Sequence, residues 1–154
     1  MGKDGNLTRP QIRNKMGKIF ATCLLLSSQM YSVPPAVLAG INHVEGGQVG
    51  QEAGPNVNGT YDLGPMQINT AWLPELASHW GVSQSTARRW VRDDACTNVG
   101  VAAWILRTSL DETGDLATAI AYYHSHRPSY GQDYEKKVVG SMNRYGLILA
   151  ADGR

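Results

Sequence analysis

The chain of 154 residues has little charge and almost no excess of either sign. Only 18% of its residues are charged, and 14 lysines and arginines against 13 aspartates and glutamates leave a net charge of +1. This balance argues against a dedicated nucleic-acid binder, which usually carries a clear basic excess, and equally against an acidic disordered segment. No apolar run approaches the roughly 18 residues of a transmembrane helix, so we expect none. The length predicts one domain.

Cysteine is also scarce, with Cys23 and Cys96 alone. Two cysteines are too few for a zinc finger, and no histidine has metal-ligand spacing with a cysteine or an acid. We therefore expect no metal and no other cofactor. The two thiols are either buried and reduced, as in a cytosolic protein, or joined as a disulfide in an oxidising compartment. Composition leaves both states open.

The N-terminal residues are basic. Residues 1–21 hold five lysines and arginines against one acid, and an apolar run begins at Ile19 and ends at Leu26. This order is that of a signal peptide, but the run is short and no clean cleavage site follows. We therefore expect a disordered basic tail or a degenerate leader over residues 1–21, a folded domain over 22–147 and a C-terminal tail over 148–154.

Within the domain, apolar segments alternate with polar turns and loops. A helix is predicted to start at Val33-Pro34-Pro35 and to stop at Gly46-Gly47, just after Glu45. The segment 46–64 is rich in Gly, Asn and Gln and predicts a long loop or a small hairpin. Helical spacing of apolar residues predicts further helices around residues 72–80, 86–91, 98–110, 116–123 and 134–145. Together these segments predict a single, mainly α domain.

Three segments hold the residues best suited to chemistry. Glu45 ends an apolar helical face, where burial would raise its pKa toward that of a general acid near neutral pH. The turn Gly64-Pro65-Met66-Gln67 fixes the direction of an amide and two apolar side chains. The segment 121–125 ends a helix with tyrosine hydroxyls and an imidazole. Taken singly, each segment also has an ordinary interpretation. Glu45 could be a surface glutamate at a helix end, the turn could be a common loop, and Tyr123 could be a core tyrosine.

In combination these segments resemble the soluble lytic transglycosylase family, and most of all its small members that accompany secretion, conjugation or pilus machines. The family's catalytic helix ends in Glu-Ser or Glu-Gly, its Gly-Leu-Met-Gln motif follows, and Tyr-His-Ser or Ala-Tyr-Asn comes late. The corresponding residues here are Glu45-Gly46-Gly47, Gly64-Pro65-Met66-Gln67 and Tyr123-His124-Ser125. The small members also have a cysteine before the first helix and another in Asp-x-Cys-x-Asn, here Cys23 and Asp94–Asn98. The resemblance implies a lysozyme-like α+β fold.

The resemblance further implies that the protein cleaves peptidoglycan. Glu45 would protonate the glycosidic oxygen between N-acetylmuramic acid and N-acetylglucosamine, then deprotonate the muramyl C6 hydroxyl, which closes a 1,6-anhydro ring. Substrate-binding residues would be Gly64, Met66, Gln67, Tyr123, His124 and Tyr134. A hydrolytic muramidase is the alternative, and an inactive domain that binds glycan without cleaving it is a further one. Ordinary glycosidases need a second carboxylate. Asp62 and Glu52 are the nearby acids for that place, although Asp62 before Leu63-Gly64 is interpreted as a loop-fixing side chain.

The same resemblance implies a Cys23–Cys96 disulfide and export to the periplasm or the medium, because peptidoglycan lies outside the cytoplasmic membrane. Expected partners are glycan strands and components of a secretion or conjugation machine, with no nucleic acid. We expect a monomer.

A hypothesis from another class comes from residues 75–90, which resemble a DNA-binding helix-turn-helix. Ser83 would cap the second helix, and Arg88 and Arg89 could face DNA. The near-zero net charge gives little affinity for phosphates, so an ordinary helical hairpin is preferred. Of the tryptophans, Trp72, Trp80 and Trp104 are expected in the core and Trp90 in either place, with none expected as a sugar platform.

Overall fold

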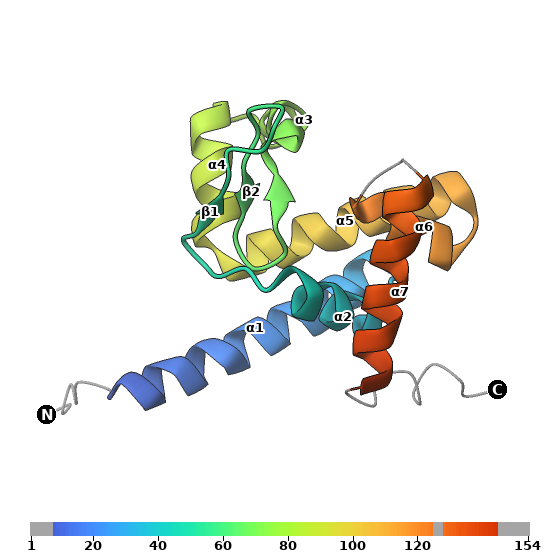
Figure 1. Ribbon diagram of the computed structural model, residues 1–154. Coiled ribbons are helices and arrows are strands. Elements are labelled where there is room, and N and C mark those ends of the chain that lie inside the picture. The colour runs from blue at the N-terminus through green and yellow to red at the C-terminus, as the bar shows by residue number, and fades with distance from the viewer. Residues whose placement is uncertain (1–7, 125–127, 145–154) are drawn as a thin grey trace, which may run out of the picture.

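Helices make up most of the computed structural model, which describes residues 8–124 and 128–144 (Figure 1). In chain order the elements are α1 (Arg9–Tyr31), α2 (Pro35–Glu45), β1 (Glu52–Ala53), β2 (Asp62–Leu63), β3 (Ile68–Asn69), η1 (Thr70–Trp72), α3 (Leu73–Trp80), α4 (Gln84–Asp93), α5 (Ala95–Thr113), α6 (Leu116–His124) and α7 (Pro128–Arg144). The prediction of a mainly α domain is confirmed. Ser125 of the Tyr-His-Ser motif, Tyr145 and the predicted tail 148–154 lie outside the described residues.

Helix α1 begins earlier than the expected boundary at residue 22. The side-chain carbonyl of Gln11 accepts a hydrogen bond of 2.8 Å from the backbone N–H of Thr8, and Pro10 lies in the first turn. Both features favour a helix start, so four of the basic residues expected in a disordered tail, Arg9, Arg13, Lys15 and Lys18, lie on a helix. Only the later half of α1 packs on the domain, where Cys23 and Leu24 are buried against α5 and α2. The earlier half projects from it (Figure 1).

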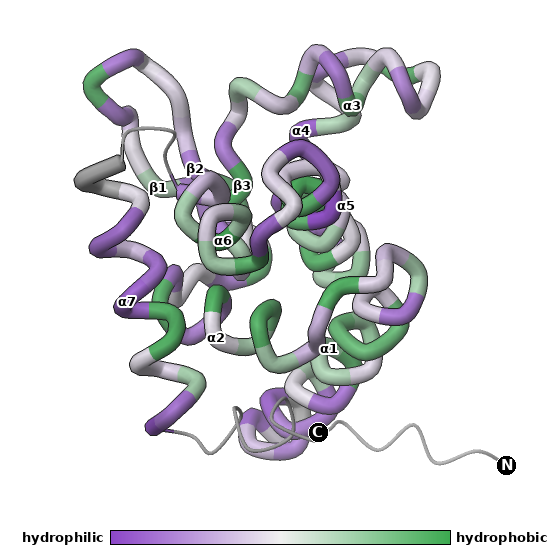
Figure 2. Tube along the Cα trace, turned by 90° about the vertical axis from the view of Figure 1, so that its right-hand side faces the viewer, coloured by the Kyte–Doolittle hydropathy of each residue, from purple (hydrophilic) through white to green (hydrophobic). Residues whose placement is uncertain are grey.

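The core lies where α2, α5, α6 and α7 meet. Leu38 and Ile41 of α2 and Leu106 of α5 are fully buried, and the hydrophobic stretches of α2 and α5 lie toward the middle of the domain in Figure 2. Helix α7 crosses α2 so closely at Gly40 that a side chain on this residue would collide with Met142 and Val138. This packing holds the C-terminal end of α2 in a fixed position.

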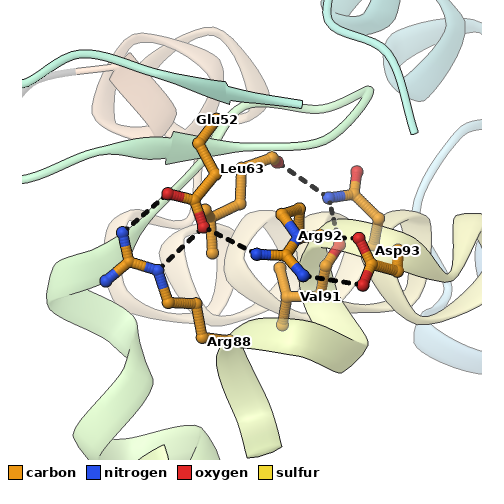
Figure 3. Close-up of polar contacts among 7 residues, drawn as sticks. Glu52, Leu63, Arg88, Val91, Arg92 and Asp93 are labelled. Carbon is orange, nitrogen blue, oxygen red and sulfur yellow. Dashed lines mark hydrogen bonds and ion pairs between the residues drawn. The ribbon is translucent and has the colours of Figure 1, made fainter. Parts of the chain in front are cut away.

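The segment between α2 and α3 contains a small antiparallel sheet in the order β1-β2-β3, as the predicted loop or small hairpin allowed. Glu52 pairs with Leu63, and Leu63 with Ile68. The carboxylate of Glu52 ties β1 to α4, since it accepts hydrogen bonds of 2.9 and 2.8 Å from Arg88 and one of 3.2 Å from Arg92 (Figure 3). The Arg88 guanidinium thereby lowers the pKa of Glu52.

Asn98 of α5 ties the sheet to the helices from inside the core. Its Oδ1 accepts a hydrogen bond of 2.8 Å from the Met66 backbone N–H, and its Nδ2 donates to the carbonyls of Leu63, at 2.8 Å, and Val91, at 2.9 Å. The side chain is fully buried. A buried amide with these partners fixes β2, the turn after it and α4 in one arrangement.

We expect Asn98→Ala to lower the free energy of unfolding by about 3 kcal/mol, because three buried backbone groups lose their partner at once. Urea denaturation followed by circular dichroism measures the change. Asn143→Ala on the exposed surface of α7 is the matched control, and its stability should be unchanged. Equal stability of the two variants would contradict the structural role of Asn98.

A disulfide joins Cys23 of α1 to Cys96 of α5, with the two Cα atoms 4.9 Å apart. This confirms the pairing that the family resemblance implied, and it decides between the two states that composition left open. A disulfide is compatible with an exported protein. In the part of the chain that the structure describes, no helix combines the length and apolar character needed to cross a bilayer.

Candidate functional site

A cleft of about 990 Å³ opens between the end of α2, the sheet and the helices α5 and α6. Its walls are mixed, with amides and hydroxyls on the sheet side and aromatic rings on the helix side. The lining residues are Glu45, Asn56, Val57, Asn58, Thr60, Asp62, Gln67, Ile68, Asn69, Ala71, Trp72, Ile105, Tyr122, Tyr123 and His124. A wide cleft of this composition suits a polar ligand with apolar faces.

Glu45 is the last residue of α2, and Gly46 after it takes a left-handed conformation at φ 63°. Burial raises the pKa of Glu45 to about 7, the nearby Tyr134 hydroxyl lowers it, and the negative charge of Asp62 raises it. Burial is the largest of these causes. A carboxyl group with this pKa holds or releases a proton near neutral pH, as general acid–base chemistry requires.

Two tyrosines and a histidine support the cleft behind Glu45. The ring of Tyr134 stacks on Tyr123, with centroids 6.3 Å apart, and on His124, with centroids 4.6 Å apart. The Tyr123 hydroxyl donates a hydrogen bond of 2.8 Å to the Met66 carbonyl. The buried Tyr134 hydroxyl has no hydrogen-bond partner of ordinary geometry among the described residues. Burial raises the pKa of both tyrosines, so both keep their protons.

The turn from Gly64 to Gln67 packs directly on the chain that leaves Glu45. A side chain on Gly47 would collide with the Gly64 carbonyl and the Gln67 amide, so only glycine fits there. The Gln67 Nε2 atom donates to the Gly64 carbonyl at 2.9 Å, and the Asn42 Nδ2 atom donates to the Pro65 carbonyl at 3.2 Å. The Glu-Gly-Gly sequence therefore lets this turn approach Glu45 closely.

Asp62 holds the loop of the sheet together, as interpreted from its sequence context, and it also lines the cleft. Its Oδ2 accepts a hydrogen bond of 3.1 Å from Asn56, and its Oδ1 accepts one of 3.0 Å from Asn69. Glu52, the other acid near Glu45 in the sequence, points to Arg88 and Arg92 instead. Of the two candidates for a second carboxylate, only Asp62 shares the cleft with Glu45.

All but one of the predicted catalytic and substrate-binding residues line or support this cleft. Glu45, Gln67, Tyr123 and His124 line the cleft. Tyr134 lies behind the last two, and Gly64 shapes the turn at φ 67°.

Met66 was expected to contact a ligand, and the structure corrects this. Its side chain is fully buried in the core. The turn reverses the chain between the positive φ angles of Gly64 and Gln67, which directs the Met66 side chain inward. Its contribution to the cleft is the carbonyl that accepts from Tyr123.

Sequence reasoning missed the sheet side of the cleft. Asn56, Thr60 and Asn69 line it, and their one sequence signal is the Asn-rich segment between two short strands. Trp72, expected in the core, is half-buried and lines the cleft with its ring edge-on to Trp104, at a centroid distance of 5.5 Å.

The predicted helical hairpin exists as α3 and α4. Ser83 caps α4, since its hydroxyl oxygen accepts a hydrogen bond of 3.1 Å from the Thr86 backbone N–H. Arg88, however, directs its guanidinium to Glu52 (Figure 3). The same guanidinium lies over the Tyr61 ring, 5.1 Å from its centroid. This side chain serves the packing of the sheet on α4.

A second hollow, of about 660 Å³, lies on the far side of Trp104, between α3, α4 and α5. Its lining is mostly apolar, with Trp80, Trp90 and Glu75 among its residues. The Glu45 cleft is the stronger candidate for chemistry because it holds the carboxyl group with the raised pKa. Within the described ranges, no three histidines, cysteines or acids lie close enough together to hold a metal ion.

Comparison with known proteins adds no assignment. No protein-family model matches the chain, and no curated protein matches it. The chemistry of the cleft is therefore the basis for a function.

Proposed function

We propose that the protein is a lytic transglycosylase that cleaves the β-1,4 bond between N-acetylmuramic acid and N-acetylglucosamine in peptidoglycan. The observation that carries this proposal is Glu45, a carboxyl group with a pKa of about 7 at the wall of a wide cleft lined by both polar and aromatic side chains. The motif resemblance supports the same activity, and the disulfide between its two cysteines agrees with it.

The reaction needs one group that gives a proton and then takes one. Protonated Glu45 donates to the glycosidic oxygen as the bond to C1 breaks. The resulting carboxylate removes the proton of the muramyl C6 hydroxyl, whose oxygen attacks C1. A pKa of about 7 leaves both forms of Glu45 populated near neutral pH. The negative charge of Asp62 stabilises the positive charge that develops at C1.

The other walls of the cleft suit a glycan strand. The ring of Trp72 offers an apolar surface for the face of a sugar. Elsewhere in the lining, Asn56, Asn58 and Gln67 offer amide groups that can hydrogen bond to hydroxyl and N-acetyl groups. The role of the enzyme would be to open the cell wall locally for a secretion, conjugation or pilus machine, from the periplasm or from outside the cell.

The direct test is incubation of the purified protein with peptidoglycan sacculi, with soluble muropeptides measured by chromatography. Release that rises with time and enzyme concentration supports the proposal. Absence of release from intact, disulfide-bonded protein contradicts it.

A hydrolytic muramidase is the second candidate, and the position of Asp62 favours it. In retaining hydrolases a second carboxylate forms or stabilises the intermediate that water then attacks. Asp62 shares the cleft with Glu45, and two amides hold it in place. Glu45 would be the general acid in either reaction. The two reactions are therefore distinguished by the effect of a substitution at Asp62 and by the chemical ends of the products.

We expect Asp62→Asn to reduce the rate of muropeptide release by roughly 10-fold while every product still ends in a 1,6-anhydro ring. The substrate's own C6 hydroxyl remains the nucleophile, so Asp62 provides only electrostatic stabilisation. A loss of 1,000-fold or more, on the order seen when an essential catalytic group is removed, together with reducing-end products from the wild type, would establish the hydrolase instead. Asp133→Asn on the exposed surface of α7 is the matched control.

A further inference from the structure

Helix α1 carries an exposed apolar surface that the domain does not cover. Met16, Ile19, Leu26 and Met30 are 51%, 48%, 57% and 74% exposed. At 3.6 residues per turn these four side chains fall within a sector of about 80°, so they form one stripe along the helix. Of the buried residues of α1, Leu24 lies about a quarter turn away, whereas the disulfide-bonded Cys23 lies within this sector, between the pair Met16 and Ile19 and the pair Leu26 and Met30. Cys23 interrupts the stripe, and the four apolar side chains on either side of it remain exposed while α1 is packed on the domain.

The charges of α1 all have one sign. Arg9, Arg13, Lys15 and Lys18 are exposed, and the helix has no acidic residue. By helical position the two arginines flank one side of the apolar stripe and the two lysines flank the other. Apolar side chains bordered by lysine and arginine are typical of helices that lie in the interface of a membrane, where long basic side chains reach the headgroups.

The same charges disfavour other occupants. A second copy of α1 would bring four further positive charges and no negative one to the contact. Nucleic acid would match the charge but leave the apolar stripe in water. An anionic lipid surface matches both features, since it takes up apolar side chains below its headgroups and attracts the bases.

We propose that α1 binds anionic lipid bilayers through the stripe of Met16, Ile19, Leu26 and Met30 and its flanking bases. The helix lies parallel to the membrane surface and holds the domain beside it. Because this surface shares no residue with the Glu45 cleft, the inference is independent of the proposed enzymatic function.

Flotation of the full chain with lipid vesicles tests this. We expect binding to vesicles of phosphatidylcholine mixed with phosphatidylglycerol, and binding at least about tenfold weaker to phosphatidylcholine alone. Lys15→Gln combined with Lys18→Gln should weaken binding to the anionic vesicles by about 20-fold. Met16→Ser combined with Ile19→Ser should weaken it by at least about tenfold.

The matched control for charge is Arg89→Gln combined with Lys136→Gln, which removes two exposed positive charges from α4 and α7 and should leave binding unchanged. Circular dichroism confirms that each variant is folded, since the substituted side chains are exposed. Equal binding to both vesicle types, or equal loss in the α1 and control variants, overturns the proposal. So does a lack of binding to either vesicle type, which would assign the stripe to a protein partner.

Discussion

Glu45→Gln is expected to reduce muropeptide release by a factor of about 10² to 10⁴, with little change in stability. Glutamine keeps the size and hydrogen-bonding capacity of the side chain but cannot donate a proton to the glycosidic oxygen or accept one from C6. Release from sacculi, measured as initial rate over a range of enzyme concentrations, gives the factor. The pKa of about 7 also predicts the direction in which activity changes with pH. The protonated form starts the reaction, so kcat/KM of the wild type should fall as pH rises above about 7.

Glu75→Gln is the matched control, because it makes the same chemical change at an exposed residue on α3, outside the Glu45 cleft. It should release muropeptides at the rate of the wild type and show the same pH profile. A Glu45→Gln protein that retains half of the wild-type rate would exclude Glu45 as the acid. A wild-type pH profile without an ionisation near pH 7 would show that burial does not raise the pKa of Glu45 to this value.

The second large effect concerns stability. We expect Cys23→Ser combined with Cys96→Ser to lower the free energy of unfolding by about 4 kcal/mol. The bond spans a sequence separation of 73 residues, and a loop of that size restricts the unfolded chain strongly in the chain-entropy model. It also ties the packed half of α1 to the first turn of α5, and Cys23 is buried. Urea denaturation of the oxidised wild type and of the double variant measures the difference.

Reduction is the internal control for this prediction. Dithiothreitol should destabilise the wild type by a similar amount and leave the double serine variant unchanged. Destabilisation of the wild type by less than about 1 kcal/mol on reduction would show that packing, and not the covalent bond, holds α1 to the domain.

The helices could be predicted from local signals in the chain. Proline before α2, glycine after Glu45 and the apolar spacing of α5 and α6 act within a few residues of one another, and the structure has these helices near the predicted positions. The start of α1 differs from the expected boundary because a basic segment before an apolar run resembles a leader, while the local start signal consists only of Thr8, Pro10 and Gln11.

The site could be predicted only where a single residue carries its own signal. Glu45 follows an apolar helical face, and its burial follows from that position. Met66 was misplaced because the direction of its side chain depends on two positive φ angles in the turn. The cleft position of Asp62 depends on the register of β2 with β3, and that of Trp72 on the path of the chain after β3. Such long-range geometry has no local pattern in the sequence.

The central claim is that this cleft cleaves glycan strands by attack of the muramyl C6 hydroxyl. Mass spectrometry of the muropeptides that the wild-type protein releases from sacculi tests it most directly. We expect 1,6-anhydromuramic acid at the newly formed ends, which weighs one water less than the reducing end of a hydrolysed strand. Products with reducing ends alone would contradict it.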